Sequence, residues 1–198
     1  MIIEAILSTL GADRNTHFAP VGVIFLDDMK NPGEAEELRF KLYEGSHTYE
    51  NLRAHGEGAI SLTGNVLYFV DAGLRKSCET HPSKSVKPHR LAHASAFWEF
   101  SVSSFDASQN PALITTKVLR YEQLCGFSGL CRAHGAVLEA AVAASRRGFL
   151  PKRAIEAPWP YWREIVEKTG GVREREAFDI LSKKLTGEGF SLEGEDLI

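Results

Sequence analysis

The first half of the chain is built from short apolar runs that end at turn residues. Such runs occupy Ile2–Leu10, His17–Leu26, Leu38–Tyr43, Gly58–Leu62 and Ala94–Phe105. Within Leu38–Tyr43 apolar and basic residues alternate, which is typical of a half-buried strand because successive side chains point to opposite faces. Residues that favour turns, such as glycine, asparagine and aspartate, separate many of the runs. The pattern predicts a β-rich unit that extends to about Phe105.

One short helix is predicted inside this unit. Ser46 and Thr48 are both suited to cap its start, Glu50 lies near its positive end, and Gly56 lies just past its last turn. The segment that begins at Ser46 therefore opens a helix of about two turns.

Beyond Pro111 the apolar pattern changes to the period of helices. Helices are expected over Cys131–Arg147, Tyr161–Thr169 and Val172–Leu185, with a linker at Pro151–Pro160. About 60 residues that hold three short helices bury little apolar surface by themselves. The expected organisation is a β-rich domain over residues 1–110 and a helical C-terminal subdomain over residues 111–198 that packs on it.

Composition and charge reduce the range of functions that the protein could have. The 198 residues are 43% hydrophobic and 25% charged, which is typical of a folded globular chain. The 23 basic and 26 acidic residues leave a formal charge of −3, and the basic residues do not gather on one face as in nucleic-acid-binding proteins. No stretch approaches the roughly 18 apolar residues of a membrane span, and three cysteines are too few for a disulfide scaffold. These features predict a cytoplasmic protein without a nucleic-acid or membrane partner.

The start of the short helix is the first candidate for chemistry. A helix N-terminus presents unpaired N–H groups, so Ser46, His47 and Thr48 in the first turn could hold a phosphate group. Arg39 or Lys41 on the preceding strand could add a positive charge. The simpler alternative is that Ser46 or Thr48 only caps the helix and that His47 is solvated.

The second candidate is the segment Asn15–Gly22, in which polar residues run into an apolar strand. Pro20 has no backbone N–H, which indicates the edge of a sheet or a bulge. The small residues Ala19 and Gly22 would let a flat ring approach the backbone. The alternative is an edge strand that Pro20 merely protects from aggregation.

Several of these segments together resemble one known family. NTHFAPVGV, RFKLYEGSHTYENL, AFWEF and AHGAVLEAAVAASR are similar to domain-of-unknown-function family 447, whose members are flavin-binding split-barrel proteins. The resemblance covers nearly the whole chain. It implies a mainly β fold with α: a six-stranded Greek-key split β-barrel that binds FMN, plus a C-terminal helical subdomain.

The resemblance also implies a cofactor, partners and a function. It implies a homodimer with FMN in a groove at the subunit interface, and a flavin-dependent oxidoreductase or electron carrier whose small-molecule redox partner is unknown. A link to methanopterin one-carbon metabolism follows from the same likeness. The competing class is a non-enzymatic dimeric interaction protein or a zinc-binding protein that uses the barrel as a scaffold.

The cofactor-binding residues that the resemblance implies fall in two segments. The phosphate would be held by Ser46, His47 and Thr48, with Asn51 beneath the turn. The ring and ribityl chain would contact Asn15, Thr16, His17, Phe18, Ala19 and Pro20, together with Tyr43, Glu44 and Gly45. The sequence identifies no catalytic residue, and motifs such as GxSxG, the P-loop and HExxH are missing.

The zinc hypothesis rests on a loop between Arg75 and His93. Cys78, His81, His89 and His93 occur there at spacings that zinc ligands often show. Two prolines in the loop argue against a zinc finger, and exposed imidazoles in basic loops are commonly only solvated.

The apolar strand Ala94–Phe105 motivates the expected dimer. Ala96, Trp98 and Phe100 point to one face, and Phe97 and Glu99 point to the other. One small barrel would not cover both faces, so a large interface of more than about 2,000 Å² is predicted.

Overall fold

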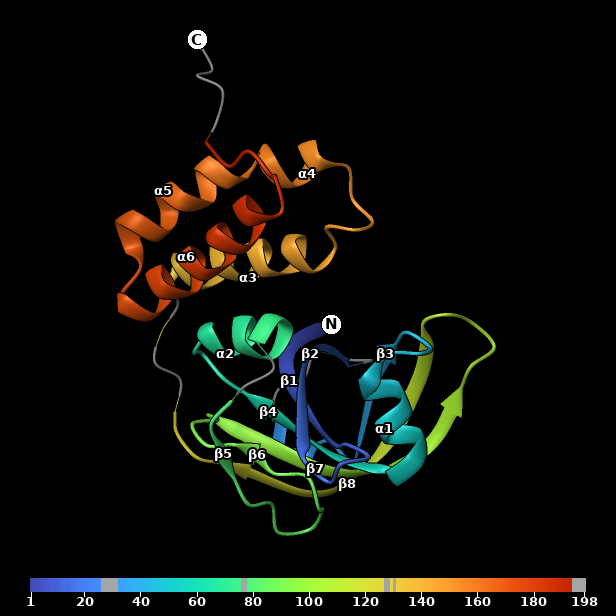
Figure 1. The fold of residues 1–198 in the computed structure, drawn as a ribbon. Helices are drawn as coiled ribbons and strands as arrows, with labels where there is room; N and C mark the ends of the chain where they lie inside the picture. The colour runs from blue at the N-terminus through green and yellow to red at the C-terminus, as the bar shows by residue number, and fades with distance from the viewer. Residues whose placement is uncertain (26–31, 76–77, 127–128, 130, 194–198) are drawn as a thin grey trace. The chain divides into compact units, whose positions relative to one another are not determined.

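The computed structural model describes residues 1–25, 32–75, 78–126, 129 and 131–193 (Figure 1). The chain divides into two compact units. One comprises Met1–Thr63 and Lys76–Gly126, and the other comprises Gly64–Arg75 and Phe127–Ile198. Leu26 and residues 194–198, which belong to the predicted second run and to the chain end, lie outside the described residues.

The first unit is a closed six-stranded barrel. Its strands are β1 (Ile2–Leu10), β2 (Thr16–Ile24), β3 (Glu37–Leu42), β4 (Glu57–Leu62), β7 (Ala96–Asp106) and β8 (Ala112–Gln123). They follow one another around the barrel in the order β1-β2-β3-β8-β7-β4, and all neighbours are antiparallel. The predicted split-barrel fold is therefore confirmed. A short 3-10 turn, η1 (Pro32–Glu34), lies between β2 and β3.

The alternating apolar side chains of the strands fill the interior of the barrel. Leu7, Leu38, Phe40, Ile60 and Ile114 have no exposed surface, and the rings of Phe40 and Phe100 meet edge to face at 5.7 Å. Burial of apolar side chains is the main favourable term in folding, so this cluster provides much of the stability of the unit.

Strand β8 corrects the expected change to helices after Pro111. Ala112–Gln123 is a strand that pairs with β3 on one side and with β7 on the other. Its apolar residues Ala112 and Ile114 alternate with half-buried ones, which is the period of a strand rather than a helix. The barrel unit thus extends beyond residue 110.

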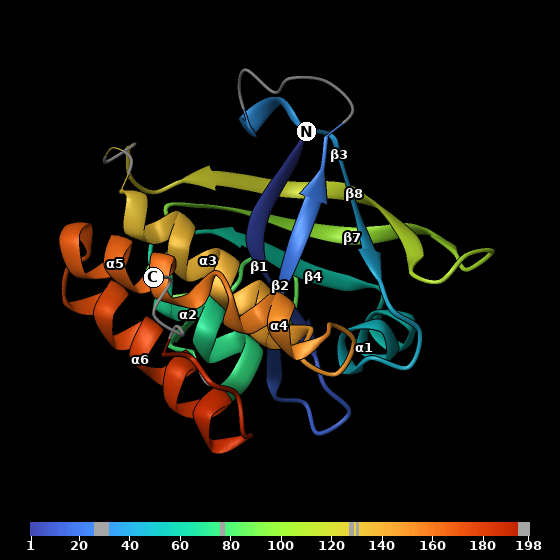
Figure 2. The same ribbon diagram turned by 90° about the horizontal axis from the view of Figure 1, so that it is seen from above.

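Helix α1 (His47–His55) lies beside the barrel (Figures 1 and 2). Ser46 is its N-cap, and Gly56 ends it in the left-handed conformation with φ of 65°. A left-handed φ is easily adopted by glycine, which explains the stop at this position. The predicted helix start and end are both confirmed.

A segment of the barrel unit, residues 78–95, covers the outer face of β7. It contains a two-stranded ribbon of β5 (Thr80–His81) and β6 (Arg90–Leu91). The Arg90 guanidinium lies 4.5 Å from the centre of the Phe97 ring, and both Glu99 carboxylate oxygens accept backbone N–H bonds from this segment. Phe97 is 2% and Glu99 0% exposed in a single chain. The sequence argument that only a partner subunit could cover this face is therefore wrong.

The second unit is a bundle of helices with its own core. Its elements are α2 (Leu67–Val70), the π-helical turn η2 (Asp71–Arg75), α3 (Arg132–Ser145), α4 (Lys152–Glu156), α5 (Trp159–Thr169) and α6 (Val172–Gly187). The alanine stripe of α3 packs with Trp159, Phe178 and Leu181. Helix α4 lies within the expected linker Pro151–Pro160.

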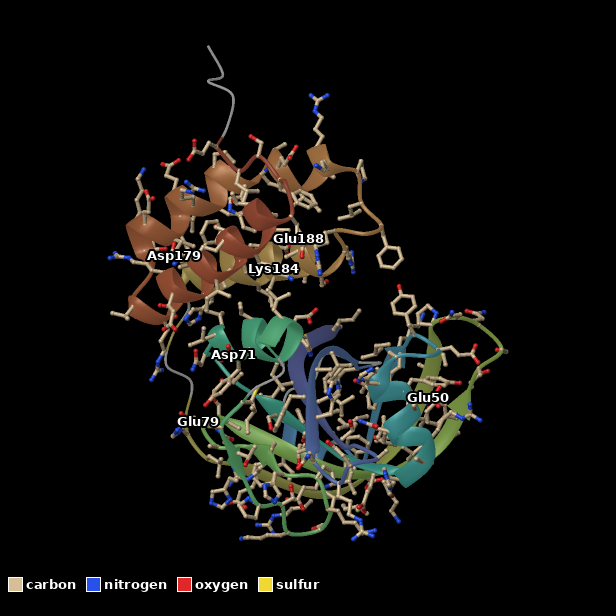
Figure 3. The ribbon with its side chains drawn as sticks, viewed as in Figure 1. Glu50, Asp71, Glu79, Asp179, Lys184 and Glu188 are labelled. Atoms are coloured by element: carbon tan, nitrogen blue, oxygen red, sulfur yellow. The ribbon has the colours of Figure 1, made fainter. Side chains whose placement is uncertain are left out.

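The core of this unit includes residues from a segment distant in the chain. Val66 and Val70, from the insertion at Gly64–Arg75, belong to the same buried cluster as α3 and α6. On the surface, Lys184 and Glu188 form an ion pair at 2.9 Å near the end of α6 (Figure 3). Within the described residues, no helix has the length and apolar character needed to cross a membrane.

Candidate functional site

The barrel opens along one edge of β2. Strand β2 pairs with β1 over its full length, from Leu10↔Thr16 to Ile2↔Ile24. Among the described residues it pairs with β3 only at Val23 and Ile24. Along residues 18–22, the side of β2 away from β1 therefore pairs with no strand that the structure describes. This part of β2 is the open edge.

Pro20 lies within this open edge. It is opposite Ile6 of β1, and it is exposed. Because proline lacks an N–H, it loses no ladder hydrogen bond at an edge. The prediction of an edge at Pro20 is confirmed. The same strand turns Phe18 inward, where it is 2% exposed, so its ring belongs to the packing of the unit.

The turn between β3 and α1 leads into the same region. The Ser46 N–H donates to the Tyr43 carbonyl oxygen at 3.2 Å, and Gly45 adopts a φ of 78° in this turn. A Cβ on Gly45 would meet no atom within 4 Å, so its conformation rather than crowding selects glycine here. The Glu44 N–H donates to Asn110 Oδ1 at 3.3 Å. Tyr43 is 67% exposed beside this turn.

The first turn of α1 contains two hydroxyl groups with different surroundings. Ser46 Oγ accepts the Tyr49 N–H at 3.3 Å and thereby caps the helix. Thr48 is only 4% exposed, and its hydroxyl forms no hydrogen bond with any residue that the structure describes. The Thr48 hydroxyl oxygen is not among the buried side-chain atoms of the described residues that lack a partner, so solvent or a ligand can reach it.

Two histidines join the β2 edge to the helix start. The ring of His17, at the start of β2, lies 5.7 Å from the ring of His47, the first residue of α1, with an interplanar angle of 47°. The two residues are thirty positions apart in the chain. This contact shows that the two predicted segments, Asn15–Pro20 and Tyr43–Asn51, come together in the fold.

The two predicted asparagines have partners within the protein. Asn51 Nδ2 donates to Thr9 Oγ1 at 3.0 Å and links α1 to β1. Asn15 Nδ2 and its backbone N–H donate to the two Asp13 carboxylate oxygens at 2.8 and 3.0 Å. The hydrogen bond from the Asn15 side chain is the main reason that the pKa of Asp13 lies below its ordinary value. The Asn15 side chain thus stabilises the β1–β2 turn.

The basic side chain that lies beside the helix start is not one of the two that the sequence suggested. Arg39 forms an ion pair with Glu37, two residues toward the start of β3, while Lys41 is exposed. His17 is the additional basic group that the fold brings to the first turn of α1. Its proximity to His47 has no signal in the local sequence.

Sequence reasoning also missed three residues that hold the site in place. The Thr9 hydroxyl accepts from Asn51, Asn110 accepts from Glu44, and the His89 N–H donates to Thr16 Oγ1 at 2.9 Å. Each comes from a segment distant in the chain. Only long-range strand and loop contacts place them here, so no local motif could have indicated them.

The histidine-rich segment does not assemble the suggested zinc ligands. His93 Nε2 lies 3.0 Å from Glu79 Oε2, His81 Nδ1 lies 3.2 Å from the Pro82 carbonyl oxygen, and His89 Nδ1 lies 3.3 Å from Thr80 Oγ1. Figure 3 labels Glu79 at this ribbon. In the described part of the chain, no three histidine, cysteine or acidic side chains lie close enough to hold a metal ion. Among the described residues, the three histidines therefore lie with separate partners rather than at one shared position.

The residues at the open edge fit an anionic ligand with a flat body. The first turn of α1 offers N–H groups, the Thr48 hydroxyl and the exposed His47 ring for an anion. The β2 segment with Ala19 and Pro20 carries little side-chain bulk, which suits a ring. A phosphorylated flavin has both parts.

Comparisons with known proteins point to the same class of fold. Models of the N-terminal and C-terminal domains of the family Protein of unknown function (DUF447) match residues 3–124 and 131–183. No curated protein shows significant similarity to the chain.

Solved structures of FMN-binding proteins share the fold. An FMN-bound protein of the same family from Methanosarcina mazei is 22% identical, with a TM-score of 0.70 over 92% of this chain and 94% of that chain. An FMN-binding protein from Thermus thermophilus is 12% identical, with a TM-score of 0.52 over 61% of this chain and 70% of that chain. Flavoredoxin from Methanosarcina acetivorans is 12% identical, with a TM-score of 0.51 over 62% of this chain and 69% of that chain.

Proposed function

Because the chain belongs to the DUF447 family, we propose that its barrel unit binds FMN and that the protein is a flavin-dependent oxidoreductase or electron carrier. The observation that carries this proposal is the contact between His17 and His47, which brings the open edge of β2 to the first turn of α1. The FMN-bound relative with the same fold supports the choice of ligand.

The phosphate of FMN would lie at the first turn of α1. The chain has a net charge of −3, so attraction for an anion has to come from local groups. The Thr48 hydroxyl, the N–H groups of the first turn and the exposed His47 ring supply them. Ser46 caps the helix and so keeps those N–H groups in place.

The flavin ring would lie along the open edge of β2. Backbone groups of residues 18–22 that face away from β1 can donate to and accept from the ring. Pro20 and Ala19 keep this edge free of long side chains, and Tyr43 with Glu44 would border it from the β3 end. The His89 N–H holds the Thr16 hydroxyl at one end of this edge.

Bound flavin would supply the one- or two-electron redox chemistry, so the protein's part is to bind and orient it. The residues named above would hold the phosphate and the ring, and they do not identify the electron donor or the electron acceptor. A link to methanopterin one-carbon metabolism is part of the proposal. It would be tested by whether reduced methanopterin cofactors change the absorbance of the bound flavin.

The proposal includes a homodimer. The barrel unit exposes large apolar side chains, among them Met1 at 52%, Ile2 at 62% and Leu119 at 45%, and a partner subunit would cover such residues. Sedimentation at micromolar concentration should show a dimer, with an interface above about 2,000 Å². A monomer under these conditions would remove this part of the proposal.

The FMN proposal is tested by measuring the affinities of two flavins for variants of two threonines. Thr48→Val removes the hydroxyl while keeping the shape of the side chain, and it should weaken FMN binding about five- to hundredfold. Riboflavin, which has no phosphate, should bind the variant and the wild type equally. Thr186→Val, at an exposed helical position in the other unit, is the matched control and should leave both affinities unchanged. The absence of any flavin binding by the wild type would overturn the proposal.

The pair Ser46→Ala and Thr48→Ala extends this test. Together the two changes should release FMN, and circular dichroism should show that the barrel remains folded. Loss of the Ser46 cap alone lowers helix stability by about 0.5–2 kcal/mol. If the double variant bound FMN as tightly as the wild type, the flavin would have to lie elsewhere.

A further inference from the structure

We propose that a groove between α5 and α6 binds a small zwitterion, a molecule that carries a phosphate or carboxylate group together with an amine. The groove has a volume of about 360 Å³, and the residues that line it come from these two helices. Pockets for small ligands usually begin at about 300 Å³, so the volume suits a small molecule. The groove belongs to the helical unit, whereas the FMN site is proposed in the barrel unit, so this inference does not depend on the proposed function.

Contacts near both ends of the groove hold the two helices against each other. Trp159 Nε1, at the start of α5, donates to Ser182 Oγ of α6 at 3.1 Å. At the other end, the Arg175 guanidinium donates to the Glu167 carbonyl oxygen at 3.2 Å. The groove is therefore built on two packed antiparallel helices, and its shape is formed before a ligand arrives.

The floor of the groove is apolar, and its rim is charged. Val166 and Phe178 form the floor and are 2% and 3% exposed. Figure 3 labels Asp179, one of the rim residues, on α6. Three basic and two acidic side chains form the rim: Arg163, Arg175, Lys183, Glu167 and Asp179. The rim thus offers both signs of charge above a small apolar surface, with an excess of one positive charge.

The rim charges do not pair with one another, although their spacing allows it. Residues four apart on a helix are neighbours, and the rim contains such pairs in Arg163 with Glu167, Arg175 with Asp179, and Asp179 with Lys183. Within the described residues, none of these rim groups forms an ion pair. The same spacing does produce ion pairs elsewhere along these helices, between Glu164 and Lys168 and between Lys184 and Glu188. The rim charges are therefore available to a ligand.

Charges of both signs around one small groove favour a ligand that also has both signs. An anion alone would meet Glu167 and Asp179, and a cation alone would meet the three basic side chains. Guanidinium groups bind phosphate or carboxylate through paired N–H bonds, and carboxylates accept hydrogen bonds from an ammonium group. A phosphate carries about −1.5 to −2 charges at neutral pH. A molecule with one phosphate and one ammonium group therefore has a net charge that balances the positive excess of the rim.

The experiment titrates the isotope-labelled full chain and follows the backbone amide signals of α5 and α6 by NMR. The probe is O-phosphoethanolamine, which joins a phosphate to an amine, and the controls are inorganic phosphate and ethanolamine. O-phosphoethanolamine should bind at least about tenfold more tightly than either control, because it alone engages both signs of charge. γ-Aminobutyrate tests the other oxyanion. Weaker binding than that of O-phosphoethanolamine assigns the anionic end to a phosphate, and tighter binding assigns it to a carboxylate.

Variants on the same helices separate the roles of the two signs of charge. Asp179→Asn should remove most of the preference for O-phosphoethanolamine over inorganic phosphate, whereas Glu176→Gln, at an exposed position of α6 outside the groove, should leave it unchanged. Arg163→Gln should weaken binding of both phosphate probes at least about fivefold, and Arg173→Gln is its control. If O-phosphoethanolamine binds no more tightly than inorganic phosphate, or if Glu176→Gln acts like Asp179→Asn, the groove is not a site for zwitterions. Neither result would affect the FMN proposal.

Discussion

Two regions of the barrel unit contain histidines, and they differ in whether these histidines lie together. His17 and His47 are far apart in the chain, and their rings are in contact. Cys78, His81, His89 and His93 lie within sixteen residues, yet they form no cluster that could hold a metal among the described residues. The histidines of the second region bond separately to Glu79, Pro82 and Thr80.

The difference shows what creates a chemical site in this fold. The pairing of β1 with β2 and the path from β3 into α1 bring His17 and His47 together. The second region instead runs over the outer face of β7, where its backbone N–H groups bond to the buried Glu99 carboxylate. Its role in the described structure is to cover a strand, and spacing along the chain did not indicate that role.

The largest expected effect tests the covering role of the second region. Glu99→Ala removes the carboxylate that accepts from the Lys84 and Ser85 N–H groups, and Glu99 is 0% exposed. The free energy of unfolding should fall by about 1–3 kcal/mol, because hydrogen bonds to charged groups in buried places are among the stronger ones. Urea unfolding followed by tryptophan fluorescence measures the change.

Glu57→Ala is the matched control for Glu99. Glu57 accepts a single N–H bond, from Lys87 at 3.1 Å, and that contact is exposed. Its loss should lower the free energy of unfolding by less than about 1 kcal/mol. Equal effects of the two variants would contradict the idea that Glu99 anchors the covering segment.

A smaller loss of stability is expected when the hydrogen bond that joins α1 to β1 is removed. Thr9→Val removes the acceptor of the Asn51 side-chain N–H, at a position that is 0% exposed. Stability should fall by about 1 kcal/mol. Hydrogen exchange should speed up in α1 more than in β7, since the lost bond joins α1 to β1. Uniform exchange throughout the unit would show that this bond does not hold the helix.

The β1–β2 turn near His17 gives a pH-dependent prediction. The Asn15 hydrogen bonds lower the pKa of Asp13 in the folded protein. They therefore stabilise the fold at pH values above the pKa that Asp13 has in the unfolded chain. This stabilisation is lost as the pH falls through the pKa of Asp13 in the folded protein. Asn15→Ala should raise the pKa of Asp13 toward its ordinary value, as measured by carboxyl-carbon NMR titration. An unchanged titration of Asp13 would show that another group sets it.

The smallest expected effect concerns metal in the second region. Incubation with a chelator should leave the melting temperature unchanged within about 1 °C, because the described residues there form no cluster of ligands that could lose an ion. Cys78→Ser should behave in the same way on addition of zinc. A chelator-induced drop in melting temperature that Cys78→Ser abolishes would restore the zinc hypothesis and remove the contrast between the two regions.

Local chemistry in the sequence determined several elements correctly. The Ser46 cap and Gly56 stop define α1 because they act on backbone groups within one turn. The first run, Ile2–Leu10, forms β1 because an apolar run that ends at turn residues is a local property of the sequence. The segments NTHFAPVGV, RFKLYEGSHTYENL, AFWEF and AHGAVLEAAVAASR together indicated the family that the family models confirm.

Tertiary structure alone decided how these parts meet. Closure of the barrel requires β8 to pair with β3 and β7, and that pairing makes a strand of a segment after Pro111. Burial of Phe97 and Glu99 depends on a segment that crosses β7 from elsewhere in the chain. The contact between His17 and His47 depends on where β2 separates from β3. Such pairings join residues distant in sequence, and their energies come from packing of the whole unit, so no local pattern encodes them.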